Sequence, residues 1–240
     1  MKNIKYKEWR LLIPDQLDDE MAKSLFDTVQ SGNFTLRSIL KDTYRSQVKR
    51  ISVFDKDLVL KIPNEKNTRT WIRFLTWFRT GEAFKNLKGM QLLQENGILT
   101  STPVVAAEKR SLGMVVDSWL IYEFLDGQSC VDLPSSHQAV VSALNYLHGK
   151  KLLHGDPQIR NFIQRDQGIY TIDSNPKKLG LTGFDLGYEW AYLRKSYPGI
   201  ERFYGKINES KWYRFAVQFD LIDRKLARFR KKIRAFFKSF

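Results

Sequence analysis

The chain is poor in cysteine and in long apolar segments. Its 240 residues include a single cysteine, Cys130, which excludes an intramolecular disulfide and agrees with a reducing compartment. No apolar run approaches the roughly 20 residues that a membrane-spanning helix needs. The basic N-terminal segment, residues 1–16, has an apolar stretch of only three residues, which is too short for a secretory signal. We therefore expect a cytoplasmic protein.

Acidic residues are scarce relative to basic ones. The sequence has 40 lysines and arginines against 26 aspartates and glutamates, which gives a formal charge of +14. This excess favours polyanionic partners such as nucleic acid, anionic membrane surfaces or phosphorylated substrates, and charge alone does not choose among them. With 42% hydrophobic and 28% charged residues, and without repeats, the chain is typical of one large globular domain or two small lobes.

The apolar pattern predicts a β-rich first half and a mainly helical second half. Helices are expected at residues 16–30, at 70–96 with a break near Gly81, and at 136–149. Strands are expected at residues 47–54, 58–62, 103–108 and 114–125, with a further strand pair within 161–173. The change of pattern near residues 125–127 predicts two domains, 1–125 and 126–240.

Two short segments in the second half combine apolar residues with a few polar side chains. The stretch LLHGDPQIRNFI contains Asp156 and Asn161, and GIYTID ends on Asp173. Because Pro157 prevents a regular helix interior, a loop there can direct one side chain to an acceptor and another to a metal. Phosphoryl transfer from ATP needs a carboxylate for the acceptor hydroxyl and oxygen ligands for Mg²⁺. We predict Asp156 as the catalytic carboxylate, with a turn-stabilising role as the alternative, and Asn161 and Asp173 as metal ligands.

These residues and three upstream segments resemble the protein-kinase-like superfamily. HGDPQIRN is similar to its catalytic loop and IDSN to its metal-binding turn. LVLKI resembles the strand with the phosphate-binding lysine, here Lys61, and GEAFKN begins a segment resembling the helix whose glutamate, here Glu82, pairs with that lysine. IYEFLDG resembles the strand and hinge of the adenine pocket, which implies nucleotide contacts at Glu123 and Leu125. The resemblance implies an α+β, two-lobed protein-kinase-like fold, with a β-rich N-lobe that binds ATP and Mg²⁺ and a mainly helical C-lobe.

A narrower resemblance concerns the acceptor. IYEFLDGQSCVDLP followed by HGDPQIRNFI resembles the lipopolysaccharide core heptose kinases, which phosphorylate inner-core sugars in Gram-negative bacteria. That family also has an aromatic and basic insertion between the lysine strand and the following helix. The resemblance implies an ATP-dependent sugar kinase whose partner is the lipopolysaccharide core oligosaccharide and whose target is a heptose hydroxyl. We expect no nucleic-acid partner, and a monomer rather than an oligomer.

Two other functions stay open. A small-molecule kinase of the aminoglycoside type would offer an acidic acceptor cleft to cationic substrates, and the charge of +14 argues against this class. A non-enzymatic kinase-like scaffold that binds polyanions would be expected to lack Lys61, Asp156 or Asp173. All three residues are present.

The sequence departs from the superfamily pattern at several positions. The hairpin before Lys61, within LKDTYRSQVKR, has no glycine where kinases have a glycine-rich loop. Asn175 stands where the metal-binding turn usually has glycine. Gln158 stands where protein kinases carry a lysine, so one transition-state cation is absent, and Arg160 is the candidate substitute.

Two further polar residues are expected to support the site. His154 is predicted to hold the loop by hydrogen bonding rather than to transfer protons. Asp185 is either an ordinary residue at a helix N-terminus or, as the family pattern implies, an anchor for the loop.

Two basic, aromatic stretches lie outside the predicted chemistry. In residues 69–80, RTWIRFLTWFRT, and in residues 221–240, apolar residues recur at helical spacing among basic ones. Each stripe can simply pack on the core. The alternative for the C-terminal stripe is an interfacial helix on an anionic membrane surface, which would place the protein peripherally on the cytoplasmic face of the inner membrane. That stripe comprises Ile222, Leu226, Phe229, Ile233, Phe236 and Phe240.

Overall fold

The computed structural model describes residues 1–166, 168–180 and 182–222. The chain divides into two compact units. Unit 1 comprises residues 1–127 and 170–173, and unit 2 comprises residues 128–169 and those from 174 onward. Residues 170–173 therefore belong to unit 1, although the segments on either side of them belong to unit 2.

Unit 1 is organised around a seven-stranded antiparallel sheet in the order β1-β2-β6-β7-β5-β4-β3. Side chains of neighbouring residues point to opposite faces of this sheet. In the central strand β7, Trp119 and Ile121 enter one core and Leu120 enters the other. The strands are β1 (Lys2–Tyr6), β2 (Trp9–Ile13), β3 (Thr35–Asp42), β4 (Gln47–Val53), β5 (Lys56–Ile62), β6 (Pro103–Ser111) and β7 (Met114–Glu123).

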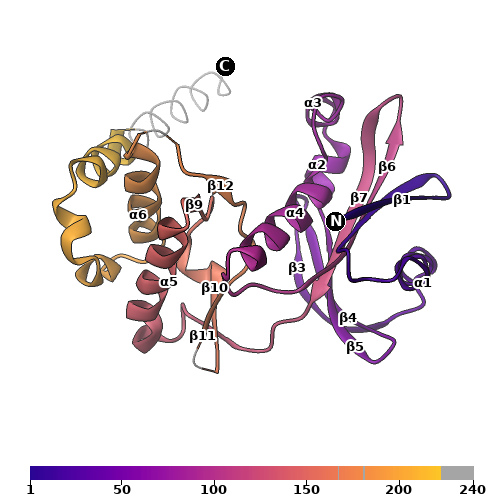
Figure 1. Ribbon diagram of the computed structural model, residues 1–240, viewed down its shortest axis with the longest axis horizontal. Coiled ribbons are helices and arrows are strands. Elements are labelled where there is room, and N and C mark those ends of the chain that lie inside the picture. The colour runs from indigo at the N-terminus through magenta and orange to yellow at the C-terminus, as the bar shows by residue number, and fades with distance from the viewer. Residues whose placement is uncertain (167, 181, 223–240) are drawn as a thin grey trace, which may run out of the picture. The chain divides into compact units, whose positions relative to one another are not determined.

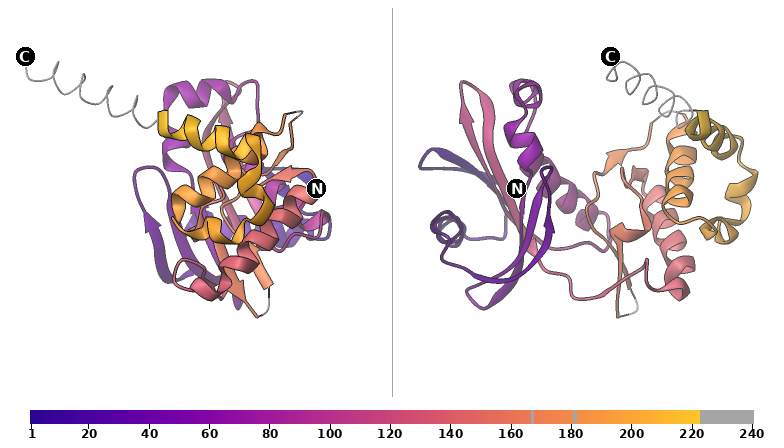
Figure 2. Two further views of the ribbon diagram at one scale, coloured as in Figure 1. Left: turned by 90° about the vertical axis from the view of Figure 1, so that its left-hand side faces the viewer. Right: turned by 180° about the vertical axis from the view of Figure 1, so that it is seen from behind.

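One long helix covers each face of the sheet. Helix α1 (Asp19–Ser31) packs Phe26 against Trp119, with ring centroids 5.7 Å apart. Helix α4 (Glu82–Glu95) contributes Leu87 to the core on the opposite face. Figure 1 and the right-hand view of Figure 2 show α1 and α4 on opposite sides of the strands. Burial on both faces explains the continuous apolar runs within the central strands, such as residues 58–60 of β5 and 119–121 of β7.

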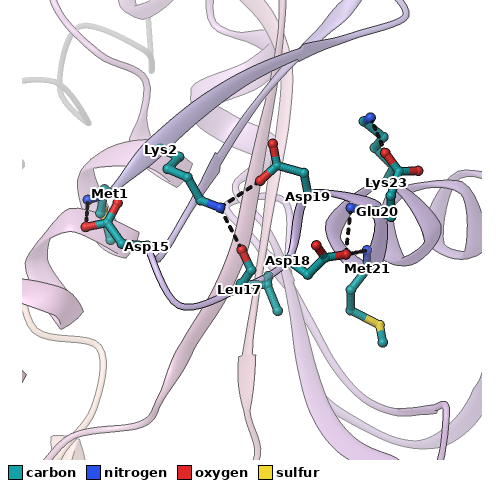
Figure 3. Close-up of polar contacts among 9 residues, drawn as sticks. All are labelled: Met1, Lys2, Asp15, Leu17, Asp18, Asp19, Glu20, Met21 and Lys23. Atoms are coloured by element: carbon teal, nitrogen blue, oxygen red, sulfur yellow. Dashed lines mark hydrogen bonds and ion pairs between the residues drawn. The ribbon is translucent and has the colours of Figure 1, made fainter.

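Polar contacts fix the N-terminal strand against the start of α1 (Figure 3). Asp18 caps the helix, since its Oδ2 accepts hydrogen bonds from the amides of Glu20 and Met21 at 3.0 and 3.1 Å. Lys2 Nζ donates to Asp19 Oδ1 at 2.7 Å. The cap explains why the helix begins later than the sequence predicts.

The segment between β5 and α4 is more broken than the sequence predicts. It forms two short helices, α2 (Asn64–Thr68) and α3 (Thr70–Leu75), before α4 begins. The predicted break at Gly81 is present, with an extended backbone there. A side-chain carbon on Gly81 would clash with the carboxylate of Glu108, so this close approach requires glycine.

The β4–β5 turn also differs from the prediction. The strands expected at residues 47–54 and 58–62 leave residues 55–57 for the turn between them, whereas Lys56 and Asp57 already belong to β5. The turn is formed by Phe54 and Asp55, with φ angles of 50° and 58°. Two consecutive left-handed residues are typical of a tight two-residue hairpin turn.

Unit 2 combines helices with short strands. Helix α5 (His137–Gly149) contacts helix α6 (Phe184–Ser196) through the buried side chain of His148. The His148 ring lies 5.2 Å from the ring of Trp190. The strands form two small sheets, β11-β10-β8 and β12-β9. Residues 211–222 are also helical. The elements are β8 (Gln128–Ser129), η1 (Pro134–Ser136), α5 (His137–Gly149), β9 (Leu152–Leu153), η2 (Ile159–Asn161), β10 (Phe162–Arg165), β11 (Gly168–Thr171), β12 (Lys177–Lys178), α6 (Phe184–Ser196), η3 (Ile200–Phe203) and η4 (Gly205–Glu209).

The C-terminal apolar stripe lies outside the described residues, apart from its first member, Ile222. Its interfacial role therefore stays a prediction. Across the described ranges, no helix combines the length and the apolar character that crossing a bilayer requires.

Candidate active site

The residues predicted for catalysis, metal and nucleotide fall into two groups. Each group lies in one unit and is built by separate elements of the fold. Unit 2 contains Asp156 and Asn161, and unit 1 contains Lys61, Glu82, Glu123, Leu125 and Asp173.

The loop between β9 and β10 brings Asp156 and Asn161 together. Asn161 Nδ2 donates to the backbone carbonyl of Asp156 at 2.8 Å and to its Oδ2 at 3.1 Å. Gln158 Nε2 donates to Asp156 Oδ1 at 2.7 Å. Both carboxylate oxygens of Asp156 therefore accept hydrogen bonds from side-chain amides, which fix the orientation of the carboxylate.

Asn161 is buried, with 5% of its surface exposed, and uses its amide nitrogen on Asp156. Its carbonyl oxygen accepts no hydrogen bond from the residues that the structure describes, and so can serve as a neutral oxygen ligand. Within these same ranges, no three His, Cys, Asp or Glu side chains are grouped to hold a metal by themselves. A neutral amide oxygen suits Mg²⁺ as one ligand, because this ion usually keeps waters or phosphate oxygens among its other ligands.

Gly155 allows the loop to form. Its φ angle is 83°, a conformation that favours glycine. A side-chain carbon there would also clash with the backbone carbonyl of Asn175. The Asn175 amide donates to the His154 carbonyl at 2.9 Å, so the turn after Asp173 is attached by its backbone to the segment that leads into the Asp156 loop. Asn175 thus replaces the usual glycine without preventing this close approach.

A buried glutamate that the sequence analysis missed holds the same loop. Glu189 of α6 is 4% exposed. Its carboxylate accepts hydrogen bonds from the amides of His154 and Gly155 at 2.9 and 2.5 Å. His148 Nε2 lies 2.9 Å from Glu189 Oε2. The signal in the sequence is an acid within an otherwise apolar helical segment, GYEWAYL.

His154 itself is fully buried. Its Nδ1 accepts a hydrogen bond of 3.3 Å from the Asp156 amide, and its ring centroid lies 5.1 Å from that of Phe162. This geometry suits the expected role of holding the loop.

Gln158 also approaches Tyr192 of α6, since its Nε2 lies 3.3 Å from the tyrosine hydroxyl. Burial raises the pKa of the Tyr192 phenol, and the negative charge of Asp156 raises this pKa further. Tyr192 is therefore a neutral phenol at physiological pH. Arg160, the candidate substitute for the missing lysine, is exposed on η2, and none of the described contacts joins it to Asp156.

Asp185 lies in the first turn of α6, as one of its two expected roles requires. A side-chain carbon on Gly180 would clash with Asp185 Oδ2, so the carboxylate also lies against the backbone that follows β12. Both expected roles are thus compatible with its position.

In unit 1, Lys61 of β5 forms an ion pair with Asp173. Asp173 follows β11 and has a φ angle of 50°, which is uncommon outside glycine and concentrates at functional sites. Thr100 Oγ1 donates to the Thr171 carbonyl at 2.8 Å and anchors the end of β11 in this unit. Burial is the largest single influence on the pKa of Lys61 and lowers it. The charge and hydrogen bond of Asp173, together with electrostatic contributions from Tyr122 and Glu82, outweigh burial and raise the pKa above its ordinary value.

No ion pair of the described residues joins Glu82 to Lys61, and their pairing stays a prediction. Glu82 is the first residue of α4 and is half-buried, and its charge contributes to the raised pKa of Lys61. The ion pair that Lys61 forms within the described residues is with Asp173, because that carboxylate reaches the ammonium directly. Asp173 therefore contacts the Lys61 ammonium directly, whereas Glu82 affects the pKa of Lys61 through its charge alone.

The predicted hinge residues lie at the end of β7, where Glu123 is the last strand residue, and just beyond it, at Leu125. The Glu123 amide donates to the Thr102 carbonyl at 2.9 Å, and the Phe124 amide donates to the Asp57 carbonyl at 3.0 Å. Leu125 is buried, and no acceptor for its amide lies among the residues that the structure describes. An amide in this position can recognise the edge of a flat polar ring.

The β3–β4 hairpin closes without glycine, as the sequence requires. The Thr43 amide donates to the Ser46 carbonyl at 3.1 Å, and the Ser46 amide donates to Thr43 Oγ1 at 3.3 Å. Tyr44 and Arg45 form the exposed tip, with a hydrogen bond of 2.8 Å from Arg45 Nε to the Tyr44 hydroxyl. A cationic and aromatic tip thus replaces the glycine-rich loop.

Comparisons with known proteins identify the family. A family model described as "Lipopolysaccharide core biosynthesis protein (WaaY)" matches residues 1–238. A lipopolysaccharide core heptose(II) kinase WaaY of Escherichia coli is 25% identical over 241 residues, 97% of each chain. The protein of that name from Escherichia coli strain K12 is 25% identical over 185 residues, 75% of each chain.

A solved structure shares the fold. The chain titled "WaaP in complex with acyl carrier protein" superposes with a TM-score of 0.59 and 16% identity, over 91% of this chain and 98% of that one. The predicted α+β, protein-kinase-like fold and the resemblance to the lipopolysaccharide core kinases are confirmed. The chain belongs to the WaaY family of lipopolysaccharide core biosynthesis proteins.

Proposed function

We propose that the protein is an ATP-dependent kinase that phosphorylates a heptose hydroxyl of the lipopolysaccharide inner core. The observation that carries this proposal is the family match over residues 1–238 in a chain that retains Lys61, Asp156, Asn161 and Asp173. The names of the two curated relatives support a core heptose as the acceptor.

Unit 1 is proposed to hold the nucleotide. Bound ATP with Mg²⁺ supplies the transferable phosphoryl group and neutralises part of its charge. The raised pKa of Lys61 keeps its ammonium charged at physiological pH, as phosphate binding requires. Asp173 is the proposed metal ligand of this unit, with Asn161 of unit 2 as the other proposed ligand residue, and Glu82 would support Lys61. The Leu125 amide and the backbone at Glu123 would recognise the adenine ring.

Unit 2 is proposed to act on the acceptor. Asp156 would accept the proton of the sugar hydroxyl as the new oxygen–phosphorus bond forms. The amides of Gln158 and Asn161 hold its carboxylate in one orientation, and Glu189 holds the backbone of the loop. These contacts keep Asp156 in place before the acceptor binds, and such preorganisation lowers the barrier to transfer.

We also propose that the protein works as a peripheral protein on the cytoplasmic face of the inner membrane. A lipid-linked core acceptor would be met there, and the formal charge of +14 favours an anionic surface. The basic stretch 221–240 remains a candidate contact.

The function is tested by deleting the gene and analysing the core oligosaccharide by mass spectrometry. The expected result is the loss of one phosphate, which the wild-type gene restores and Asp156→Asn does not. Asp166→Asn is the matched control, because Asp166 is 86% exposed in the β10–β11 turn, and it should restore the phosphate. A core that is unchanged by the deletion would overturn the proposal.

A further inference from the structure

Four aromatic side chains between β5 and α4 point outward instead of into the core. Trp71, Phe74, Trp77 and Phe78 are 68%, 40%, 57% and 81% exposed. Their rings contact one another, with centroids 5.9 Å apart for Trp71 and Phe74 and 6.2 Å apart for Phe74 and Phe78. This apolar stripe therefore does not pack on the core. Its apolar area is presented to solvent as one cluster, which is the mark of an interaction site.

Polar residues, and not these aromatic ones, attach the segment to the sheet. Asn67 of α2 is buried, and its Nδ2 donates to the Ser118 carbonyl at 2.9 Å while Ser118 Oγ donates to Asn67 Oδ1 at 2.6 Å. Thr76 is also buried, and its Oγ1 accepts a hydrogen bond of 2.8 Å from the Val115 amide. Figure 1 shows α2 and α3 beside β7, where these contacts lie. The aromatic rings are therefore held outward on a fixed base.

The β6–β7 turn extends the same surface. Arg110 Nη1 donates to the carbonyls of Thr76 and Gly113 at 3.0 and 2.8 Å, which ties the turn to the segment. The Trp77 ring lies against Gly113, where a side-chain carbon would come within 2.7 Å of Trp77 Nε1. Leu112 is 84% exposed and has a φ angle of 48°. Leu112 and Gly113, both with positive φ, form a tight two-residue hairpin turn, and this turn places the apolar Leu112 side chain at its exposed tip.

The surroundings of these residues are basic. Residues 64–80 contain four basic side chains and one acid, Glu65, which is paired with Arg69 at 2.8 Å. Two of these basic residues, Lys66 and Arg79, line an adjoining pocket of about 360 Å³ together with Lys85 and one acid, Glu82. An anionic partner is thus favoured, and a second copy of the chain is disfavoured because its basic rim would repel this one.

The four aromatic side chains and the tip of the β6–β7 turn together form an aromatic surface, which comprises Trp71, Phe74, Trp77, Phe78 and Leu112. We propose that this aromatic surface docks the protein on an anionic lipid bilayer. Aromatic rings, and tryptophan above all, prefer the headgroup boundary, and nearby lysines and arginines are attracted to anionic lipid. The inference deepens the proposed peripheral location and rests on it, but its test needs no turnover. It can therefore fail while the kinase assignment stands, and the reverse also holds.

The first test measures binding of the full chain to phosphatidylethanolamine vesicles with and without phosphatidylglycerol. The variant Trp71→Ser/Phe78→Ser removes the two most exposed rings, and should lower partitioning into anionic vesicles by about tenfold. The matched control Phe54→Ser/Tyr146→Ser removes two rings that are 52% and 51% exposed elsewhere, and should bind as the wild type does. Equal loss in both variants, or loss in neither, would overturn the proposal.

The second test locates the contact. In a Trp212→Phe background the remaining exposed tryptophans are Trp71 and Trp77, because Trp9, Trp119 and Trp190 are at most 8% exposed. Lipids brominated near the headgroup should quench the fluorescence of this protein in anionic vesicles. Absence of quenching in vesicle-bound protein would assign the contact to another part of the chain. A wild-type dimer that Trp71→Ser/Phe78→Ser converts to a monomer would instead make the surface an interface between copies, and would also overturn the proposal.

Discussion

Gln158 Nε2 donates a hydrogen bond of 2.7 Å to Asp156 Oδ1, at the position where protein kinases carry a lysine. The contact replaces a cation with a neutral amide beside the proposed catalytic carboxylate. Asn161 holds the other carboxylate oxygen in the same way. The protein thus orients Asp156 with two neutral donors.

Replacing Gln158 should therefore slow transfer without weakening nucleotide binding. Gln158→Ala removes one hydrogen bond to Asp156 Oδ1, and we expect kcat to fall by about tenfold while the KM for ATP stays unchanged. Gln158→Lys restores a donor and should recover part of the rate. Steady-state kinetics on the core acceptor test this prediction. An unchanged rate in Gln158→Ala would show that Asn161 alone is enough to orient the Asp156 carboxylate.

Asp156→Asn should nearly abolish turnover and leave ATP affinity close to that of the wild type. The amide can accept no proton from the sugar, although it fits the same space. Turnover assays test the loss of activity, and calorimetry with Mg²⁺ and ATP tests the retained ATP affinity. Wild-type turnover in this variant would remove Asp156 from the proposed mechanism.

Glu189→Gln should destabilise unit 2 although the side chain keeps its shape. The amide retains one acceptor oxygen, so one of the amides of His154 and Gly155 would face an N–H group. The expected loss is about 2–3 kcal/mol in the free energy of unfolding, since a hydrogen bond to a buried charge is lost. Chemical denaturation measures it. Glu209→Gln, at an exposed position, is the control. An equal effect in both variants would contradict the role of Glu189 in holding the loop.

The Lys61–Asp173 pair gives a prediction in alkaline solution. Because the folded-state pKa of Lys61 is raised, the pair stabilises the fold fully below the ordinary lysine pKa, and this contribution is lost as pH rises through the raised value. Asp173→Asn removes the largest of the contributions that oppose burial, so the pKa of Lys61 should fall. Acylation of Lys61 followed by mass spectrometry across pH measures it, with the exposed Lys88 as the reference.

Two alanine variants distinguish the proposed metal ligands. Asp173→Ala should weaken binding of Mg²⁺ with ATP more than Asn161→Ala does, because a carboxylate carries charge to the metal and an amide carries only a dipole. Calorimetry that shows unaltered affinity in both variants would contradict the metal site.

Local motifs made part of the site predictable. Asp156, Asn161 and Gly155 lie within one short loop, so their spacing alone indicates that they act together. Glu189 was not predictable in this way, because it reaches the loop from α6 through a tertiary contact. A charged residue in a helix is ordinarily assigned to the solvent face, whereas this one is buried because two backbone amides and a histidine surround its carboxylate.

In the fold, too, some elements could be predicted from local sequence patterns and others could not. Helix α1 and strands β4 to β7 bury regular apolar positions and could be predicted from their periodicity. Strand β3 could not, because it is an edge strand that is exposed along its whole length and so carries no burial pattern. The pairing of Lys61 with Asp173 rather than with Glu82 depends on where β11 ends in three dimensions, and the sequence does not state this.

Direct transfer of phosphate is the most decisive measurement. Purified protein, ATP and Mg²⁺ are incubated with core oligosaccharide from a strain that lacks the gene, and the product is analysed by tandem mass spectrometry. We predict the addition of one phosphoryl group to a heptose, absent with Asp156→Asn and present with Asp166→Asn. A core oligosaccharide that stays unmodified, or one phosphorylated on a sugar other than heptose, would contradict the account.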